Sequence, residues 1–447
     1  MADLRRLLAA GAAAICLAPA AAGCSEDEQP VRVAVLTECI GLLEASEESI
    51  LAAAQLPFIE RGARLRGDGP VDGLEDASVG GRPVELLVGC TTAASDLTRQ
   101  IVEVRRLIEG RGADVVIGPV GEPEGVVMRM LAARYPDVTF VLGASAAQEA
   151  TLSDPQPNVF RFVADGAQST AGLGAYAYHD LGWRRAGLVM DPFATSWEAA
   201  AGFVAEFCAL GGSVASREPL FGQLEPGGAA ADRAIGARLR REVDGTMLIA
   251  GFISTADFLR AYGRRAESLS RRLVVNGFGF VQPGGLSPGG IDLSGVVLGN
   301  DVPLDSERPQ WRRHERAYAR AFPELSPESA HGLLELPVYM AAEAVARALE
   351  RAGGHLGPHG RRLQAALSRV GFDGPAGPVR LDRNRQAVVS VHLRRIVGRG
   401  ERARTMPFRV EHEVDQSFGG AFRTDTRPPS LSSPQCRRGP VPAWAAG

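Results

Sequence analysis

The chain has 447 residues and a mass of 47.2 kDa, a length typical of two or three domains. Its 49 basic and 52 acidic residues leave a formal net charge of −3, which does not indicate a surface for nucleic acid or anionic membrane. Apart from histidine, every basic residue is arginine. The absence of lysine excludes a Walker A lysine, a Schiff-base lysine and a lysine general base.

Residues 1–23 are typical of a secretory signal peptide. Two arginines precede the apolar run 7–17, which is too short for a membrane span, and a stretch of small residues follows. Residues 21–24, Ala-Ala-Gly-Cys, resemble a bacterial lipobox, in which Cys24 would carry a diacylglycerol. Ala21 departs from that pattern, which prefers leucine, so an ordinary signal peptide is the alternative. We expect an exported protein, lipid-anchored at the cell membrane, with a polar tether over residues 24–30.

Strand-like and helix-like segments alternate from residue 31, and the alternation restarts after Pro155 and Pro157. Ser95 is the expected N-cap of the second helix, and Gly110 is expected to stop it. The final strands form a hairpin around residues 382–385, and from residue 423 the chain is rich in proline and serine. The expected strands are 31–36, 84–88, 114–117, 138–142, 185–190, 213–216, 246–250, 272–276, 296–298, 379–381 and 387–396. The expected helices are 50–64, 95–109, 123–135, 168–181, 196–210, 229–241, 256–262, 308–321, 334–351 and 360–369.

This order of elements predicts an α/β fold with two Rossmann-like lobes. Alternating strands and helices favour parallel central sheets covered on both faces, and several crossovers would join the lobes. A ligand in such a fold sits at the carboxyl ends of the strands, in the crevice between the lobes. We expect lobe 1 to comprise 31–152 with 302–372, lobe 2 to comprise 153–301 with 373–415, and residues 416–447 to form a tail.

Four cysteines, Cys39, Cys90, Cys208 and Cys436, remain once the leader and Cys24 are set aside, and they allow three pairings. Export permits disulfides. Cys39 and Cys90 each follow a strand, so both thiols would meet at one sheet edge if those strands are parallel neighbours. This favours a Cys39–Cys90 disulfide and, by exclusion, a Cys208–Cys436 disulfide that pins the tail to the body. Free buried thiols are the alternative for the second pair.

The order of several segments resembles the type I periplasmic binding proteins, in the leucine/isoleucine/valine-binding branch that supplies ABC importers. The resemblance implies a protein that is not an enzyme. It would capture an amino acid, an amide or a small carboxylate and deliver it to an ABC permease, as a monomer without cofactor, metal or nucleic acid. The segments are 31–43 (VRVAVLTECIGLL), 81–109 (GRPVELLVGCTTAASDLTRQIVEVRRLIE), 113–125 (ADVVIGPVGEPEG), 135–151 (YPDVTFVLGASAAQEAT), 157–191 (beginning PNVFRFVADG) and 372–396 (FDGPAGPVRLDRNRQAVVSVHLRRI).

The resemblance also implies a set of ligand contacts in the loops that follow the strands. In lobe 1, backbone groups and the Ser145 hydroxyl would suit a ligand carboxylate. In lobe 2, aromatic walls with a few polar groups are expected. The implied residues are Gly121, Glu122, Ala144 and Ser145 in lobe 1, and Phe193, Thr195, Ser196, Trp197, Phe252 and Phe278 in lobe 2.

Two positions depart from the amino-acid binders of that family. Ala146 stands where the amino-acid binders commonly have a hydroxyl residue. Gly277 and Phe278 follow a strand after which the amino-acid binders have an acidic residue that binds the ligand ammonium. A cationic amine without a carboxylate partner would be costly to bury. Either Glu38 or Glu122 could replace that acid, and both could equally face water. The sequence is therefore equally compatible with a carboxylate, an amide or an aromatic ligand and with an amino acid.

Two other motifs in the sequence suggest different chemistry. Residues 143–147, Gly-Ala-Ser-Ala-Ala, nearly copy the nucleophile elbow of α/β-hydrolases, but the fifth residue is alanine and no long helix follows. His355 and His359 have i, i+4 spacing, but glycines and a proline between and around them break any helix, so we expect no metal site. A secreted hydrolase using Ser145 and a ligand-sensing receptor component remain the alternatives.

Overall fold

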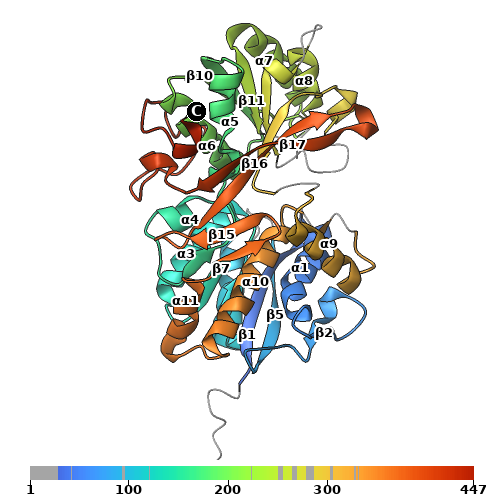
Figure 1. Cartoon of the computed structure of the whole chain (residues 1–447), viewed down its shortest axis with the longest axis vertical. Helices are drawn as coiled ribbons and strands as arrows, with labels where there is room; N and C mark the ends of the chain where they lie inside the picture. The colour runs from blue at the N-terminus through green and yellow to red at the C-terminus, as the bar shows by residue number, and fades with distance from the viewer. Residues whose placement is uncertain are drawn as a thin grey trace, which may run out of the picture.

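The computed structural model describes residues 29–446, except for 42, 93–95, 120, 223, 250–254, 264–268, 278–285, 303–305, 327–328, 331 and the side chain of Glu122. The predicted signal peptide, Cys24 and the first part of the tether lie outside the described residues. Figure 1 shows two α/β lobes stacked along the long axis of the molecule, with β15 and β16 running between them. The predicted two-lobed α/β fold is confirmed.

The sheet of lobe 1 has the strand order β4-β5-β1-β6-β7-β8. All neighbours pair in parallel except β4 and β5. Val33 and Val35 of β1 belong to one apolar core, and the intervening Ala34 and Leu36 belong to another on the opposite face. A strand buried on both faces has no polar alternation, and this explains its continuous apolar run. The strands are β1 (Val31–Ile40), β4 (Ser78–Val79), β5 (Arg82–Thr92), β6 (Val115–Ile117), β7 (Thr139–Leu142) and β8 (Val159–Arg161), and β2 (Arg64–Leu65) pairs separately with β3 (Leu74–Glu75).

Helices cover both faces of this sheet. Residues of α1, α9, α10 and α11 share the core of Val33, and residues of α2 and α3 share the core of Ala34. Asp96, not Ser95 as expected, caps α2, because its carboxylate accepts the Arg99 N–H at 2.9 Å. The helices are α1 (Glu47–Ile59), α2 (Leu97–Arg105), α3 (Glu122–Arg134), α4 (Glu149–Leu152), α9 (Pro309–Ala321), α10 (Glu335–Ala352) and α11 (Arg361–Leu367).

The larger sheet runs β10-β9-β11-β12-β13-β16-β15-β14, with β17 also paired to β16. Its first five strands are parallel, and β16 is antiparallel to β13. β17 was not expected, since its side chains are largely exposed or half-buried and it lacks an apolar run. The strands are β9 (Arg185–Met190), β10 (Ser213–Pro219), β11 (Gly245–Ile249), β12 (Leu273–Asn276), β13 (Val297–Asn300), β14 (Phe372–Gly374), β15 (Gly377–Leu381), β16 (Ala387–Val397) and β17 (Arg404–Val414), and the helices are α5 (Leu173–Ala175), α6 (Ala194–Ala209), α7 (Gly228–Glu242) and α8 (Ala256–Tyr262). No helix in the described part of the chain is both long and apolar enough to cross a bilayer.

A buried polar network ties the segments that connect the lobes. Gln386, between β15 and β16, donates to Val163 O and Gln168 Oε1 at 2.8 Å each and accepts from Arg161 Nη1 at 3.2 Å. Gln168 in turn donates to carbonyls of both β16 and β17, those of Ala387 and Val414. Because the buried polar groups satisfy one another across separate connections, the crossovers are held in one arrangement beside the interlobe space.

Two disulfides join the cysteine pairs that the sequence favoured. Cys39 is bonded to Cys90 with Cα atoms 5.4 Å apart, and Cys208 to Cys436 with Cα atoms 5.3 Å apart. β1 and β5 are parallel neighbours, as that pairing required. The tail packs against lobe 2. Phe418 is buried in an apolar cluster, and the half-buried Trp444 packs against that cluster.

A pocket between the lobes

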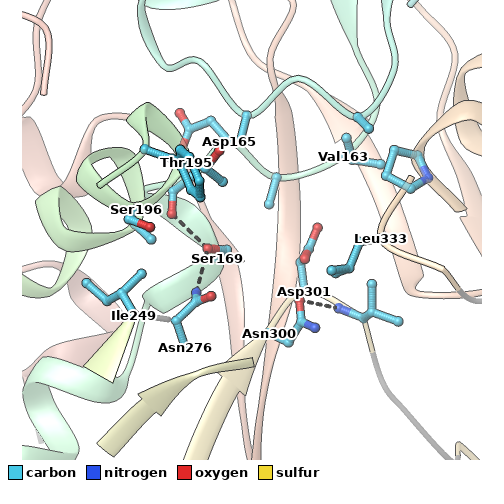
Figure 2. A pocket seen from close by; sticks show the side chains of 18 of the residues that line it. Val163, Asp165, Ser169, Thr195, Ser196, Ile249, Asn276, Asn300, Asp301 and Leu333 are labelled. Atoms are coloured by element: carbon cyan, nitrogen blue, oxygen red, sulfur yellow. Dashed lines mark hydrogen bonds between the residues drawn. The ribbon is translucent and has the colours of Figure 1, made fainter. Parts of the chain in front are cut away.

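The two lobes enclose a pocket at the carboxyl ends of their strands, the position expected for a ligand in such a fold. Its empty volume is about 790 Å³, part of it open to solvent. Residues from both lobes and from two crossovers line it, and Figure 2 shows their side chains pointing toward the same space. They are Ala144, Ala146, Val163, Ala164, Asp165, Gly166, Ser169, Asp191, Phe193, Thr195, Ser196, Ala199, Ile249, Asn276, Asn300, Asp301, Val302, Leu333 and Pro337.

The lobe 1 wall is formed by the segment after β7. Ala144 and Ala146 line the pocket, but Ser145 between them is 0% exposed and does not. The Ser145 hydroxyl faces Gly125 of α3, where an added Cβ would collide with it. In an extended segment successive side chains point to opposite sides, so Ser145 is turned away from the ligand space. That burial argues against the hydrolase alternative, which needs an accessible nucleophile.

The lobe 2 wall begins at the first turn of α6. Thr195 and Ser196 line the pocket together with Phe193, the N-cap residue of that helix. Trp197 instead packs, half-buried, against the core of lobe 2. Adjacent helical residues are turned by about 100°, so three consecutive side chains cannot all face one cavity.

The remaining expected contacts do not line the pocket within the described residues. Glu38 is 5% exposed, and its carboxylate accepts the Leu43 N–H at 3.2 Å, so it stabilises the loop after β1. Gly121 is the N-cap residue of α3. Phe252, Phe278 and the side chain of Glu122 lie outside the described residues.

Three aspartates supply the acidic groups of the pocket. Asp191 directly follows β9, Asp301 directly follows β13, and Asp165 lies in the crossover after β8. Asp191 followed a strand correctly expected to end at residue 190, so strand-end reasoning could have found it. Asp301 was missed because that strand was expected to end two residues earlier than it does. Asp165 follows no predicted strand, and no sequence signal distinguished it.

Their environments differ. Asp165 accepts hydrogen bonds from the Gln168 N–H at 2.8 Å and from Gln416 Nε2 at 3.0 Å. Burial raises the pKa of Asp165, and the Arg161 guanidinium opposes that shift. Burial also raises the pKa of Asp301, to about 6; a hydrogen bond from the Ala164 N–H opposes the shift and the charge of Asp165 adds to it.

Polar groups of lobe 2 complete the wall. The Ser169 hydroxyl donates to the Gly166 carbonyl at 2.7 Å and accepts from Asn276 Nδ2 at 3.2 Å, as the dashed lines in Figure 2 show. Asn300 Oδ1 accepts the Val302 N–H at 3.4 Å. With apolar side chains over much of the remaining lining, the pocket suits a small, partly polar molecule.

A family comparison agrees with this geometry. Residues 30–401 match the family model described as "Periplasmic binding protein". The chain belongs to the periplasmic binding protein family. Membership places the chain outside the cytoplasm and gives it a solute-binding role.

Solved structures share the fold at low sequence identity. An ABC transporter substrate-binding protein from Sphaerobacter thermophilus is 22% identical, with a TM-score of 0.71 over 87% of this chain and 99% of its own. A solute-binding protein from R. palustris in complex with benzoate is 18% identical, with a TM-score of 0.66 over 87% and 98%. A leucine-binding protein from Thermotoga maritima is 19% identical, with a TM-score of 0.65 over 85% and 98%. No curated protein matches the chain.

Proposed function

We propose that the protein is the solute-binding subunit of an ABC importer. It acts as a monomer, anchored to the membrane through a lipid on Cys24, and delivers a small molecule to a permease. Ligand binding favours a closed arrangement of the lobes, and the permease recognises that arrangement. The observation that carries the proposal is the shared pocket, whose walls come from Ala144 and Ala146 of lobe 1 and from Thr195 and Ser196 of lobe 2.

A thermal-shift screen of the protein against amino acids, amides, amines and small acids tests the proposal. A true ligand stabilises the folded protein by mass action, by about 2.7 kcal/mol at 100 times its Kd. Small-angle scattering with the same ligand should show a smaller radius of gyration, because the lobes close over it.

Ala144→Trp fills the pocket from the lobe 1 side and should abolish the thermal shift. Ala230→Trp is the matched control, since Ala230 is exposed on α7 and does not line the pocket. Circular dichroism verifies that both variants fold. An unchanged shift in Ala144→Trp would contradict a ligand site between the lobes.

A further inference from the structure

Acidic side chains, and no cationic ones, line the pocket within the described residues. Asp165, Asp191 and Asp301 line it, and no arginine or histidine does so among the described residues. The sequence contains no lysine that could do so instead. Arg161 lies beside Asp165 but is 0% exposed, is bonded to Gln386 and Ala147 O, and does not line the pocket. A ligand carboxylate would therefore meet like charges at close range.

The charge of Asp301 is poorly compensated. It is half-buried at the pocket wall, and it forms no ion pair within the part of the chain that the structure describes. Its identified partners are backbone N–H groups, and the charge identified as acting on it is another carboxylate, Asp165. A carboxylate in that position is stabilised by an arriving cation.

Asn300 provides an independent observation. It is 4% exposed and lines the pocket beside Asp301, as Figure 2 shows. Its Oδ1 is bonded to the Val302 N–H, which leaves Nδ2 as a buried donor without a partner among the described residues. A buried donor is costly to leave unsatisfied, so a ligand should offer it an acceptor.

Much of the remaining lining is apolar, with Ile249 and Ala199 from lobe 2 and Val163, Val302, Leu333 and Pro337 from the crossovers and lobe 1 side. Such a surface binds a hydrocarbon or aromatic body.

We infer that the ligand is an amine that carries no carboxylate: a protonated nitrogen lies by Asp301, a neutral oxygen or nitrogen accepts from Asn300, and an apolar body fills the rest. This inference rests on the proposed solute-binding function and narrows its ligand class. It also replaces Glu38 and Glu122 as the expected partners of a ligand ammonium.

Two series of compounds, each with one apolar body and different polar groups, test the inference. One series is 3-methylbutylamine, leucine and 4-methylpentanoate, and the other is benzylamine, benzyl alcohol and benzoate. Thermal shift and isothermal titration are measured with the full-length exported protein. The amine of each series should bind more tightly than its acid or neutral partner, and 2-methoxybenzylamine, which adds an acceptor, should bind more tightly than benzylamine.

Asp301→Asn keeps the shape of the side chain and removes its charge. We expect it to weaken binding of the amine at least about 10-fold, because one partner of a buried charge pair is lost, and to reduce the preference over the acid. Asp68→Asn is the control, since Asp68 is exposed in a lobe 1 loop away from the pocket. If Asp301→Asn fails to fold, Asn300→Ala is the second variant, and it should remove the advantage of 2-methoxybenzylamine over benzylamine.

The outcomes separate the two proposals. Tighter binding of benzoate or 4-methylpentanoate than of the amines would overturn the amine ligand and leave the solute-binding function intact. Equal binding of benzyl alcohol and benzylamine would do the same. If no compound of any class shifts the melting temperature, both the ligand class and the proposed function are contradicted.

Discussion

At the scale of single residues, burial decides what a polar group can do. Ser145 and Ala146 are neighbours, yet one hydroxyl is enclosed against α3 and the adjacent methyl faces the pocket. Glu206 of α6 is another enclosed group, at 0% exposure. Its carboxylate accepts from the Gly172 and Ala175 N–H groups at 2.9 and 3.0 Å and from Trp444 Nε1 at 2.8 Å.

Burial raises the pKa of Glu206 from its ordinary value of 4.5 to about 7, and the charge of Glu411 adds to the shift. Between these two values the unfolded chain releases a proton that the folded chain keeps, so stability falls as pH rises through that window. Glu206→Gln cannot titrate. We therefore expect the variant to gain stability relative to the unmodified protein between pH 4.5 and 7, by about 3 kcal/mol at 1.36 kcal/mol per unit.

Denaturant unfolding at several pH values measures this difference. Placing an amide at that position also changes the free energy of unfolding by an amount that does not depend on pH. This amount does not affect the result, because only the change of the difference with pH is compared. The exposed Glu401→Gln is the control for loss of a carboxylate. A difference that stays flat from pH 4.5 to 7 would contradict the assignment.

At the scale of elements, the tail after β17 is part of lobe 2. Cys436 is bonded to Cys208 of α6, and Arg217 of β10 donates to the carbonyls of Ser430 and Leu431 at 3.3 Å each. Phe418 and Trp444 pack edge-to-face with centroids 5.2 Å apart. An irregular segment rich in proline is therefore held by a covalent bond, backbone acceptors and aromatic contacts.

Replacing Cys208 and Cys436 by alanine should lower the free energy of unfolding by about 2–5 kcal/mol, since the bond closes a loop of 228 residues. Trypsin should then cut sooner after Arg437 and Arg438, which are exposed in the tail. The Cys39→Ala, Cys90→Ala pair is the comparison: it opens a shorter loop of 51 residues and should leave tail cleavage unchanged. Equal cleavage rates in the two variants would show that the tail does not depend on its disulfide.

At the scale of the whole molecule, each lobe has its own cores on both faces of its sheet, and a buried polar network joins them. Gln386, Gln168 and Gln416 take part from three different segments. Each lobe therefore has its own core, and the network fixes the connections between the lobes.

The proposed anchor also belongs to this scale. If Cys24 carries a lipid, the protein expressed in a bacterium with lipoprotein processing should fractionate with membranes and incorporate labelled palmitate. Cys24→Ala should release it without changing ligand affinity, because the two lobes begin at residue 31, beyond the tether. Cys39→Ala is a control for cysteine loss, and its membrane association should persist. Membrane association of Cys24→Ala would contradict the anchor.

The sequence by itself determined most of the elements and their order, because strands buried on both faces must be apolar and amphipathic helices must alternate with them. The run 185–190 was predicted at its observed bounds. The Cys39–Cys90 pair was anticipated on the condition that the first two strands are parallel neighbours, which β1 and β5 are. Only the tertiary structure decided which polar groups share the pocket. Asp165, Asp191 and Asp301 come from three separate connections, and their meeting depends on how the lobes and crossovers pack rather than on any local pattern.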